Sequence, residues 1–378
     1  MNIFYLSQAR LPSSAANSVH VNKMCDALAK QKHNVTLLGY KGNSDSDIYE
    51  YYSTTPNYTI KTFDLAEKTG ESIWLALKTL TWLFTRRQSI NLIYSRSAIC
   101  LFAALALRKP FIYEVHSIPR TKLHRFMERK ILKHKHLQTL VVITQQLKNW
   151  YLSEFSFLQE NRIRVLPDAS DPTDPNVIAA TLPGNAISKV GYVGHLYPGK
   201  GGELIIEIAH EVPEVDFHLV GGRNEDIARL TALKPPSNVF FHGHVPYKQT
   251  KSYLIAFDIV LAPYSEEVNL AKTDVDIGQW MSPLKIFEYM SAGKAIIASD
   301  LPVLKEVLCH ENNCLLANPR STASWTEAID KLLNENSLKE DISKNAFAHF
   351  CQYYTWESRA QQVTQVLHGD ELVLRKAR

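Results

Sequence analysis

Cysteine is scarce in this sequence, and the few cysteines form no recognisable pair. The 378 residues contain five, an odd number, and no two have the Cys-x-x-Cys spacing. This composition excludes a disulfide framework and a zinc site of ordinary spacing. It favours reduced thiols, as found in a cytoplasm.

Long apolar runs and a leader-like beginning are also lacking. The longest clean apolar run, Ala98 to Leu107, has ten residues, whereas a membrane-crossing helix needs about 20. The opening residues MNIFYL lead directly into a strand-like pattern, without the charged lead, apolar region and cleavage site of a secretory signal. We therefore expect a cytoplasmic protein.

Acidic residues are few in one segment, residues 120–135. Seven Lys or Arg stand there against a single acid, Glu128. Apolar residues recur in it at helical spacing, which predicts a basic amphipathic helix. The helix is either an ordinary solvated face or a surface for an anionic membrane or an anionic acceptor. Nucleic acid is a poorer partner, because the patch is one helix wide and has no interleaved aromatic residues.

Short apolar strands alternate with helical stretches from end to end. The length exceeds that of one ordinary core, so two domains are expected. The strands read as continuous apolar runs, which is typical of strands buried on both faces of a parallel sheet. A first series of strands is predicted at residues 3–6, 35–38, 92–94, 111–115 and 140–143, and a second at 164–166, 189–193, 216–220, 239–242, 259–261 and 295–298.

A Pro/Asp-rich run, Asp168–Pro175, separates the two series. It predicts an α/β protein with one domain at residues 1–167 and another at 168–356. In doubly wound sheets ligands bind beyond the carboxyl ends of the strands. Two such domains facing each other would place both sets of strand ends along one cleft.

One glycine-rich turn nearly matches a phosphate-binding P-loop. Gly194, Gly199 and Lys200 fit the first seven positions of G-x-x-x-x-G-K-[ST], but Gly201 stands where a magnesium-holding Ser or Thr is needed. Between a strand and a helix, such a turn presents backbone N–H groups to an anion, and Lys200 and His195 add donors. The alternative is a tight turn with a solvated lysine. A P-loop ATPase is disfavoured, because no acidic strand end is available for magnesium.

A second cluster lies in Ser282–Asp300, which reads as loop, helix and buried strand. Pro283 suits the first turn of a helix, whose free N–H groups can meet an anion. Glu288 lies one turn inside, among apolar residues, where a carboxylate can accept two ribose hydroxyls. The alternative is a surface ion pair between Lys285 and Glu288.

In this order and spacing, the motifs resemble those of a family-four glycosyltransferase. The resemblance implies the GT-B fold, two Rossmann-like domains with parallel sheets that face each other across a cleft. It also implies a nucleotide-diphosphate sugar as donor, retention of anomeric configuration, and no metal or other cofactor. The segments that carry it are residues 19–38, 192–201, 220–222, 241–245, 282–300, 304–307 and 354–356.

Roles follow for individual residues. His116 ends a strand and matches the family's histidine at the reacting sugar, so His116 and Lys200 are the predicted catalytic residues; a purely structural histidine is the alternative. Glu114 is expected to face the opposite way by strand alternation. The predicted donor-binding residues are Gly194, His195, Lys200, Gly201, Arg223, Val245, Ser282, Leu284, Lys285 and Glu288. The predicted acceptor-binding residues are Ala16, Asn17, Tyr94, Arg96 and Arg120.

The chain departs from the family pattern in three places. Trp280 stands where the first Glu of a Glu-x7-Glu pattern is expected, and Ser282 or Asp276 is expected to take over its contact. His195 replaces a common Arg, and the first loop, Pro12–Ser18, lacks the usual paired glycines. As in family members, a C-terminal helix within residues 357–378 is expected to return to the N-terminal domain.

The prediction is therefore a metal-independent, retaining glycosyltransferase with a glycan or lipid-linked acceptor. A role in cell-surface polysaccharide synthesis, peripheral to the inner face of the membrane, follows from the resemblance. Two alternatives stay open: a nucleotide-sugar epimerase of the same fold, and a non-catalytic nucleotide-sugar-binding module.

Overall fold

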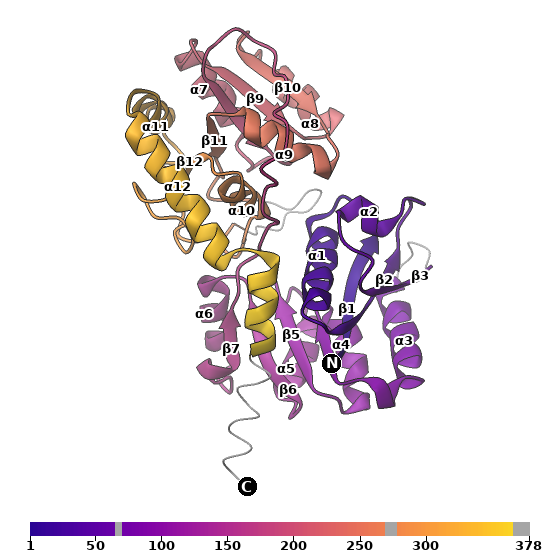
Figure 1. The fold of residues 1–378 in the computed structure, drawn as a ribbon. Coiled ribbons are helices and arrows are strands. Elements are labelled where there is room, and N and C mark those ends of the chain that lie inside the picture. Colours follow the sequence, from indigo (N-terminus) through magenta and orange to yellow (C-terminus); the bar gives the residue numbers. More distant parts are fainter. Residues whose placement is uncertain (65–69, 269–277, 366–378) are drawn as a thin grey trace. The chain divides into compact units, whose positions relative to one another are not determined.

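The protein forms two compact units, as the computed structural model in Figure 1 shows. The structure describes residues 1–64, 70–268 and 278–365. The first unit comprises Met1–Pro167 together with the chain from Trp356 onward, and the second comprises Asp168–Thr355. Each unit contains one parallel sheet with helices packed against it, so the predicted α/β class is confirmed.

The first unit contains a seven-stranded sheet with the order β3-β2-β1-β4-β5-β6-β7. The strand order reverses between β1 and β4, which makes the carboxyl ends of these strands a preferred ligand position. The strands are β1 (Asn2–Leu11), β2 (Asn34–Lys41), β3 (Thr59–Phe63), β4 (Leu92–Ser95), β5 (Phe111–Val115), β6 (Leu137–Val142) and β7 (Ile163–Val165). The helices are α1 (Ala16–Lys30), α2 (Ile48–Tyr52), α3 (Glu71–Phe84), α4 (Ala98–Ala104), α5 (Lys122–Leu132), α6 (Gln145–Glu154) and a final helix over residues 356–365.

The second unit contains a six-stranded sheet with the order β10-β9-β8-β11-β12-β13, and its order reverses between β8 and β11. The strands are β8 (Lys189–Val193), β9 (Asp216–Val220), β10 (Val239–Gly243), β11 (Ile259–Ala262), β12 (Ala295–Ser299) and β13 (Leu315–Ala317). The helices are α7 (Gly202–Glu211), α8 (Asn224–Thr231), α9 (Tyr247–Ala256), α10 (Leu284–Ser291), α11 (Thr322–Asn334) and α12 (Asn336–Tyr353).

Three strands differ from the prediction. The strand near 164–166 was assigned to the second series, but β7 pairs with β6 and closes the first sheet. β3 and β13 were missed. β3 is an edge strand in which only Phe63 is buried, so it lacks the continuous apolar run of a buried strand. β13 is too short, at three residues, to give a periodic signal.

Tyr289 fixes α10 against the carboxyl end of the second sheet. Its buried hydroxyl accepts a hydrogen bond from Val193 N (2.9 Å) and donates toward Leu261 O (3.2 Å). α10 is thereby tied to β8 and β11, the two strands at which the strand order reverses. This attachment brings the first turn of α10 beside the glycine-rich loop that follows β8.

The basic segment at residues 120–135 forms α5, as its spacing predicted. Glu128, Ile131 and Leu132 are buried, whereas Leu123 and Phe126 are 64% and 50% exposed. The apolar residues of this helix therefore divide between the core and the surface. Within the described ranges, no helix is both long enough and apolar enough to cross a membrane.

Candidate functional site

The glycine-rich loop joins β8 to α7. At its last position, Gly201, it has no room for the Ser or Thr side chain of a P-loop. Gly201 immediately precedes α7 and has a φ of 87°, a left-handed conformation that favours glycine. A Cβ atom there would overlap the carbonyl oxygen of Pro263. The Ser or Thr of a magnesium-binding P-loop has no room at this position, which explains the departure from that motif.

Replacing Gly201 with serine is expected to destabilise the second unit by about 1–3 kcal/mol, because backbone strain and overlap with Pro263 add together. Chemical denaturation followed by circular dichroism measures the change. Gly293 has a comparable φ of 61°, but a Cβ atom added there would meet open space, so Gly293→Ser is the control for strain alone. Equal losses in both variants would contradict steric exclusion at Gly201.

Two buried lysines converge at this loop. Lys200 and Lys285 are 9% and 8% exposed. Their ammonium groups lie 4.8 Å from the ring centre of Tyr264, and Lys285 Nζ lies 3.7 Å from that of Tyr192. Lys285 Nζ has no hydrogen-bond partner among the described residues. Neither ammonium group has an ion pair with a carboxylate among the described residues, so together they form a site that an anion would stabilise.

Burial shifts the titration of both lysines. It lowers the pKa of Lys200 to about 8. The pKa of Lys285 falls well below its usual range, first because of burial and then because of the charge on Lys200. The expected alternative, a surface ion pair between Lys285 and Glu288, is therefore wrong: Lys285 is buried, and its ammonium group has no hydrogen-bond partner in the part of the chain that the structure describes.

Glu288 lies on α10, one turn from Lys285. Burial raises the pKa of its carboxyl, against the charge of Lys251 and a hydrogen bond from Tyr247 that lower it. The Lys251 ammonium is held by the carbonyl oxygens of Asp171 (3.2 Å) and Pro172 (2.7 Å). The Glu288 carboxylate therefore lies among polar groups beside the site formed by Lys200 and Lys285. There it can accept hydrogen bonds from neutral hydroxyls.

The other predicted donor residues surround the same strand ends. Gly194 follows β8 directly, and a Cβ there would lie 3.0 Å from Lys285 Nζ. The His195 side chain is exposed, and its carbonyl accepts a hydrogen bond from Tyr192. Ser282 Oγ accepts from Asp168 N at 2.8 Å. Leu284 and Val245 are half-buried, and exposed Arg223 caps α8. Asp276 lies outside the described residues.

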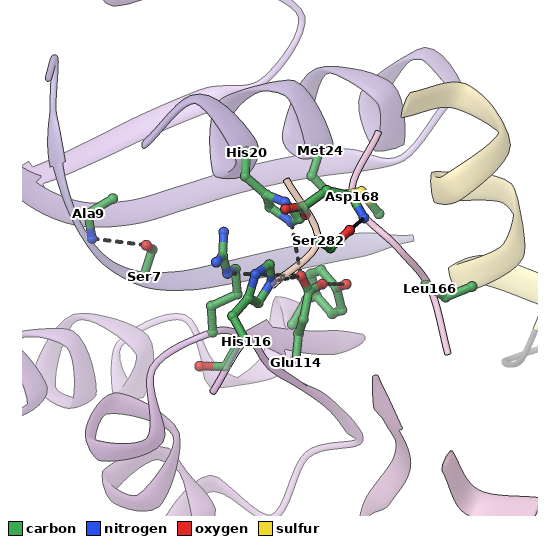
Figure 2. Close-up of polar contacts among 12 residues, drawn as sticks. Ser7, Ala9, His20, Met24, Glu114, His116, Leu166, Asp168 and Ser282 are labelled. Carbon is green, nitrogen blue, oxygen red and sulfur yellow. Dashed lines mark hydrogen bonds and ion pairs between the residues drawn. The ribbon is translucent and has the colours of Figure 1, made fainter. Parts of the chain in front are cut away.

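In the first unit, a cluster centres on the buried carboxylate of Glu114 (Figure 2). His116 Nε2 lies 2.5 Å and His20 Nε2 lies 3.0 Å from Glu114 Oε1. Arg359 reaches Glu114 Oε1 and Oε2 at 3.1 and 3.3 Å, and the Tyr94 hydroxyl donates to the same carboxylate. Burial alone would raise the pKa of Glu114, but Arg359, His20 and His116 hold it well below its usual range.

This cluster corrects two expectations. Glu114 was expected to face away from His116, but the two side chains touch. Residues two apart in extended chain share a face, and this relation persists one residue beyond β5. Tyr94 was expected to contact an acceptor, but it is fully buried and bonded to Glu114. It positions the cluster instead.

Sequence reasoning missed two members of this cluster, His20 and Arg359, and the ion pair with Glu114 makes Arg359 the more important of them. Arg359 comes from the helix at 356–365, and it also donates to the carbonyl oxygens of Pro167 (2.8 Å) and Leu166 (3.2 Å). This C-terminal helix belongs to the first unit. The available signal was an arginine three residues after Trp356, which ends the family-like segment 354–356, on a helix expected to return to the first domain.

His20, Glu114 and His116 are also close enough to be considered as metal ligands, because their ligand atoms all lie within 4.8 Å of one another. The guanidinium of Arg359 already neutralises the carboxylate at 3.1 Å. A divalent cation would meet that fixed positive charge inside a buried site. The donor set therefore fits an arginine-neutralised carboxylate better than a metal centre.

A cavity of about 320 Å³ opens next to His116. Arg96 lies at its wall; the side chain is 11% exposed, and its Nε is 3.9 Å from Glu114 Oε1. The other predicted acceptor residues, Ala16, Asn17 and Arg120, are exposed. The cavity is lined by Gln8, Ser72, Arg96, Ala98, Ile99, Tyr113, Glu114, Val115, His116, Ser117, His124, Met127 and Glu128.

Comparisons with known proteins agree with this arrangement. Residues 18–174 match the family model "Glycosyltransferase Family 4", and residues 187–335 match "Glycosyl transferases group 1". An uncharacterized glycosyltransferase of Methanocaldococcus jannaschii is 25% identical over 47% of this chain and 44% of its own. The putative teichuronic acid biosynthesis glycosyltransferase TuaH of Bacillus subtilis is 30% identical over 30% of this chain and 27% of its own. The chain thus spans less than half the length of either relative.

A solved structure shares the whole fold. Anabaena HepE, in complex with UDP and glucose, superposes with a TM-score of 0.72 at 18% identity, covering 97% of this chain and 99% of that one. At this identity the likeness shows the fold alone. The described chain therefore has the architecture of that protein, with two Rossmann-like units.

Proposed function

Because this chain belongs to the family-four glycosyltransferases, whose two domain models match most of its length, we propose that it transfers a sugar from a nucleotide-diphosphate sugar to a glycan or lipid-linked acceptor with retention of configuration. The pair of buried lysines at the Gly194–Gly202 loop, neither of which is ion-paired within the part of the chain that the structure describes, carries the proposal. A diphosphate supplies the negative charge that these two ammonium groups lack. The complex of the similarly folded HepE with UDP supports a nucleotide diphosphate as the donor group.

The chemistry requires negative charge to develop on the departing diphosphate. The bond between the anomeric carbon and the diphosphate oxygen breaks, a bond from the acceptor hydroxyl oxygen forms, and the hydroxyl proton passes to the diphosphate. Lys200, Lys285, the loop amides and the amino end of α7 stabilise that charge in a site shielded from water. Glu288 accepts hydrogen bonds from the ribose hydroxyls, and His116 bonds a hydroxyl of the transferred sugar.

Two lysines perform the work that magnesium performs in other transferases. Gly201 leaves no room for a metal-holding hydroxyl, which supports the proposal that lysines take the place of magnesium. The role in cell-surface polysaccharide synthesis is supported by the name of TuaH, a teichuronic acid biosynthesis glycosyltransferase. We also propose that the protein is located at the inner face of the cytoplasmic membrane.

Incubation with a panel of nucleotide-diphosphate sugars, with and without excess chelator, tests the function. We expect release of the nucleoside diphosphate from one donor, at a rate unchanged by chelator, and a rise in melting temperature with that donor. Interconversion of the sugar without release would identify an epimerase. Binding with neither release nor interconversion would identify a non-catalytic module. A strict requirement for added divalent metal would contradict metal independence.

A further inference from the structure

The cavity beside His116 lies where the strand order of the first sheet reverses. Gln8 of β1, Arg96 just after β4 and Glu114 of β5 all line it. In such sheets ligands bind at this point, beyond the carboxyl ends of the strands. The cavity volume of about 320 Å³ is at the small end of the range for small-molecule sites, roughly 300–1,000 Å³. A space of this size suits one sugar ring rather than several.

The wall of the cavity combines paired charges, neutral polar groups and apolar surface. Glu114 Oε1 lies 3.1 Å from Arg359 Nη2 and 3.9 Å from Arg96 Nε. Gln8 Nε2 donates to Ser72 Oγ at 2.9 Å. Apolar surface comes from Ala98, Ile99, Val115 and Met127. This mixture suits a sugar, because a sugar ring presents both hydroxyls and C–H groups.

Glu128 of α5 is the second buried carboxylate at the wall. It is 1% exposed and accepts hydrogen bonds from the hydroxyls of Tyr113 (2.8 Å) and Tyr151 (2.9 Å). Burial, and then the charge on Glu128, raise the pKa of both tyrosines well above its usual range, so both remain donors. Within the described ranges, the ion-pair partner of Glu128 is His124, whose Nε2 lies 3.4 Å from Glu128 Oε1.

His124 has one ring nitrogen beside Glu128 and the other available to a ligand. Its side chain lines the cavity and is 33% exposed. Nδ1 has no hydrogen-bond partner in the part of the chain that the structure describes, and the backbone of His124 is fixed by its hydrogen bond to Thr121 Oγ1 (3.0 Å). The same order of groups occurs at His116, whose Nε2 lies 2.5 Å from Glu114 Oε1. Two histidines, each with a buried carboxylate behind it, therefore line one cavity.

The carboxylate behind His124 determines which ligand group the ring can bind. A carboxylate beside Nε2 keeps the proton on that nitrogen. Nδ1 then accepts a hydrogen bond when the ring is neutral and donates one when the ring is protonated. A hydroxyl both donates and accepts, so it can bond Nδ1 in either state, whereas an ionised carboxylate or phosphate only accepts.

We propose that His124 selects the acceptor: its Nδ1 bonds a hydroxyl of an uncharged sugar ring that occupies this cavity, and Glu128 is the residue that positions His124. This inference rests on the proposed function and specifies the sugar that the acceptor presents. Tyr113 and Tyr151 hold the Glu128 carboxylate in place. The apolar part of the wall contacts the C–H groups of the ring.

The acceptor class is tested with the active donor and p-nitrophenyl glycosides of neutral hexoses and of the matching uronic acids. We expect kcat/KM for the best neutral glycoside to exceed that for its uronide by about tenfold. In His124→Ala the KM for this neutral acceptor should rise about tenfold, the usual effect of losing one hydrogen bond. The donor KM and kcat should stay within about threefold, because His124 does not contact the donor.

Monodeoxy analogues of the best acceptor identify the hydroxyl that His124 binds. For one analogue the KM of the wild-type protein should rise about tenfold. The same analogue should bind His124→Ala no worse than the parent glycoside does, because the contact is already lost. His124→Gln keeps a polar side chain beside Glu128 but removes Nδ1, so it gives the same test in a protein whose buried carboxylate retains a hydrogen-bond donor.

Glu128→Gln tests the positioning role. It keeps the shape of the side chain and should raise the acceptor KM in the wild-type background but not in His124→Ala. A merely structural effect of Glu128 would persist in both backgrounds. Arg125→Ala is the matched control: it removes a cation one residue further along α5, from a side chain that is 53% exposed and outside the cavity. It should leave the acceptor KM unchanged.

Three results would overturn the inference: an acceptor KM unchanged in both His124 variants, equal use of the neutral glycoside and its uronide, or an equal rise in acceptor KM in Arg125→Ala. Each of them is measured with an enzyme that transfers sugar, so each differs from failure of the proposed function. In that case the wild-type protein would release nucleoside diphosphate from no donor at all.

Discussion

Replacement of Lys200 by methionine is expected to lower kcat/KM by roughly 10²–10³-fold, the usual effect of removing one preorganised donor to a developing oxyanion. The same change should stabilise the ligand-free protein. Lys200 is 9% exposed, its charge acts on the ammonium group of Lys285, and it has no ion pair with a carboxylate in the described ranges. Methionine fills a similar volume without a buried charge. A fall in activity together with a rise in stability would identify Lys200 as a binding residue, whereas loss of a structural lysine would lower stability.

Stability of the ligand-free protein and binding of the donor are expected to change in opposite directions as pH rises. Burial lowers the pKa of Lys200 to about 8, whereas an unfolded lysine titrates near 10.4. Between these values the unfolded state binds more protons, so the stability of the ligand-free protein rises as pH increases through this range. Over the same range, capture of the donor weakens because Lys200 loses its charge. Both trends should be reduced in Lys200→Met.

Denaturation curves and donor kinetics from pH 6 to 10 measure the two effects. Lys344→Met is the matched control, since the Lys344 side chain on α12 is 74% exposed. Loss of both activity and stability in Lys200→Met would show that the lysine supports the loop rather than the donor. An unchanged kcat/KM would remove Lys200 from the site.

Sequence reasoning was most successful where the signal was local. Strands such as β8 and β12 are continuous apolar runs because both faces of the sheet are covered, and the order of strands and helices then determined the fold class. The segment Leu284–Ser291 could be predicted as a helix from Pro283 at its start and Gly293 beyond its end. The motif residues at strand ends, such as Gly194 and Lys200, could also be predicted, because their signal is local in the sequence.

The Glu114 cluster could not be assembled from the sequence. Arg359 and Glu114 are 245 residues apart, with the whole second unit between them in the chain. Local periodicity contains no information about such a pairing. Tyr94 was misassigned because the end of a strand predicts the position of a residue but not whether its hydroxyl is already bonded. Only the packed structure shows which polar groups have partners.

His116→Ala is expected to lower kcat by about 100-fold, the usual contribution of a histidine that acts on a reacting group. His116 is half-buried, and its ring is bonded to Glu114, which is itself fixed by Arg359. Such a ring is held in one orientation at the end of β5, as the positioning of a sugar hydroxyl requires. The donor KM should change much less than kcat.

The measurement combines steady-state kinetics with the melting temperature of each variant. His136→Ala alters a half-buried histidine of the first unit outside the Glu114 cluster and should leave kcat within about twofold. Arg359→Met serves as the second comparison: it leaves a buried carboxylate without its cation, which costs about 3–5 kcal/mol, so stability falls along with activity. If His116→Ala lost stability to a similar degree and kept its kcat, the histidine would be one more support of Glu114. If His116→Ala instead lost activity with its folding intact, Glu114 and Arg359 would be the residues that position the ring, and His116 would be the residue that contacts the substrate.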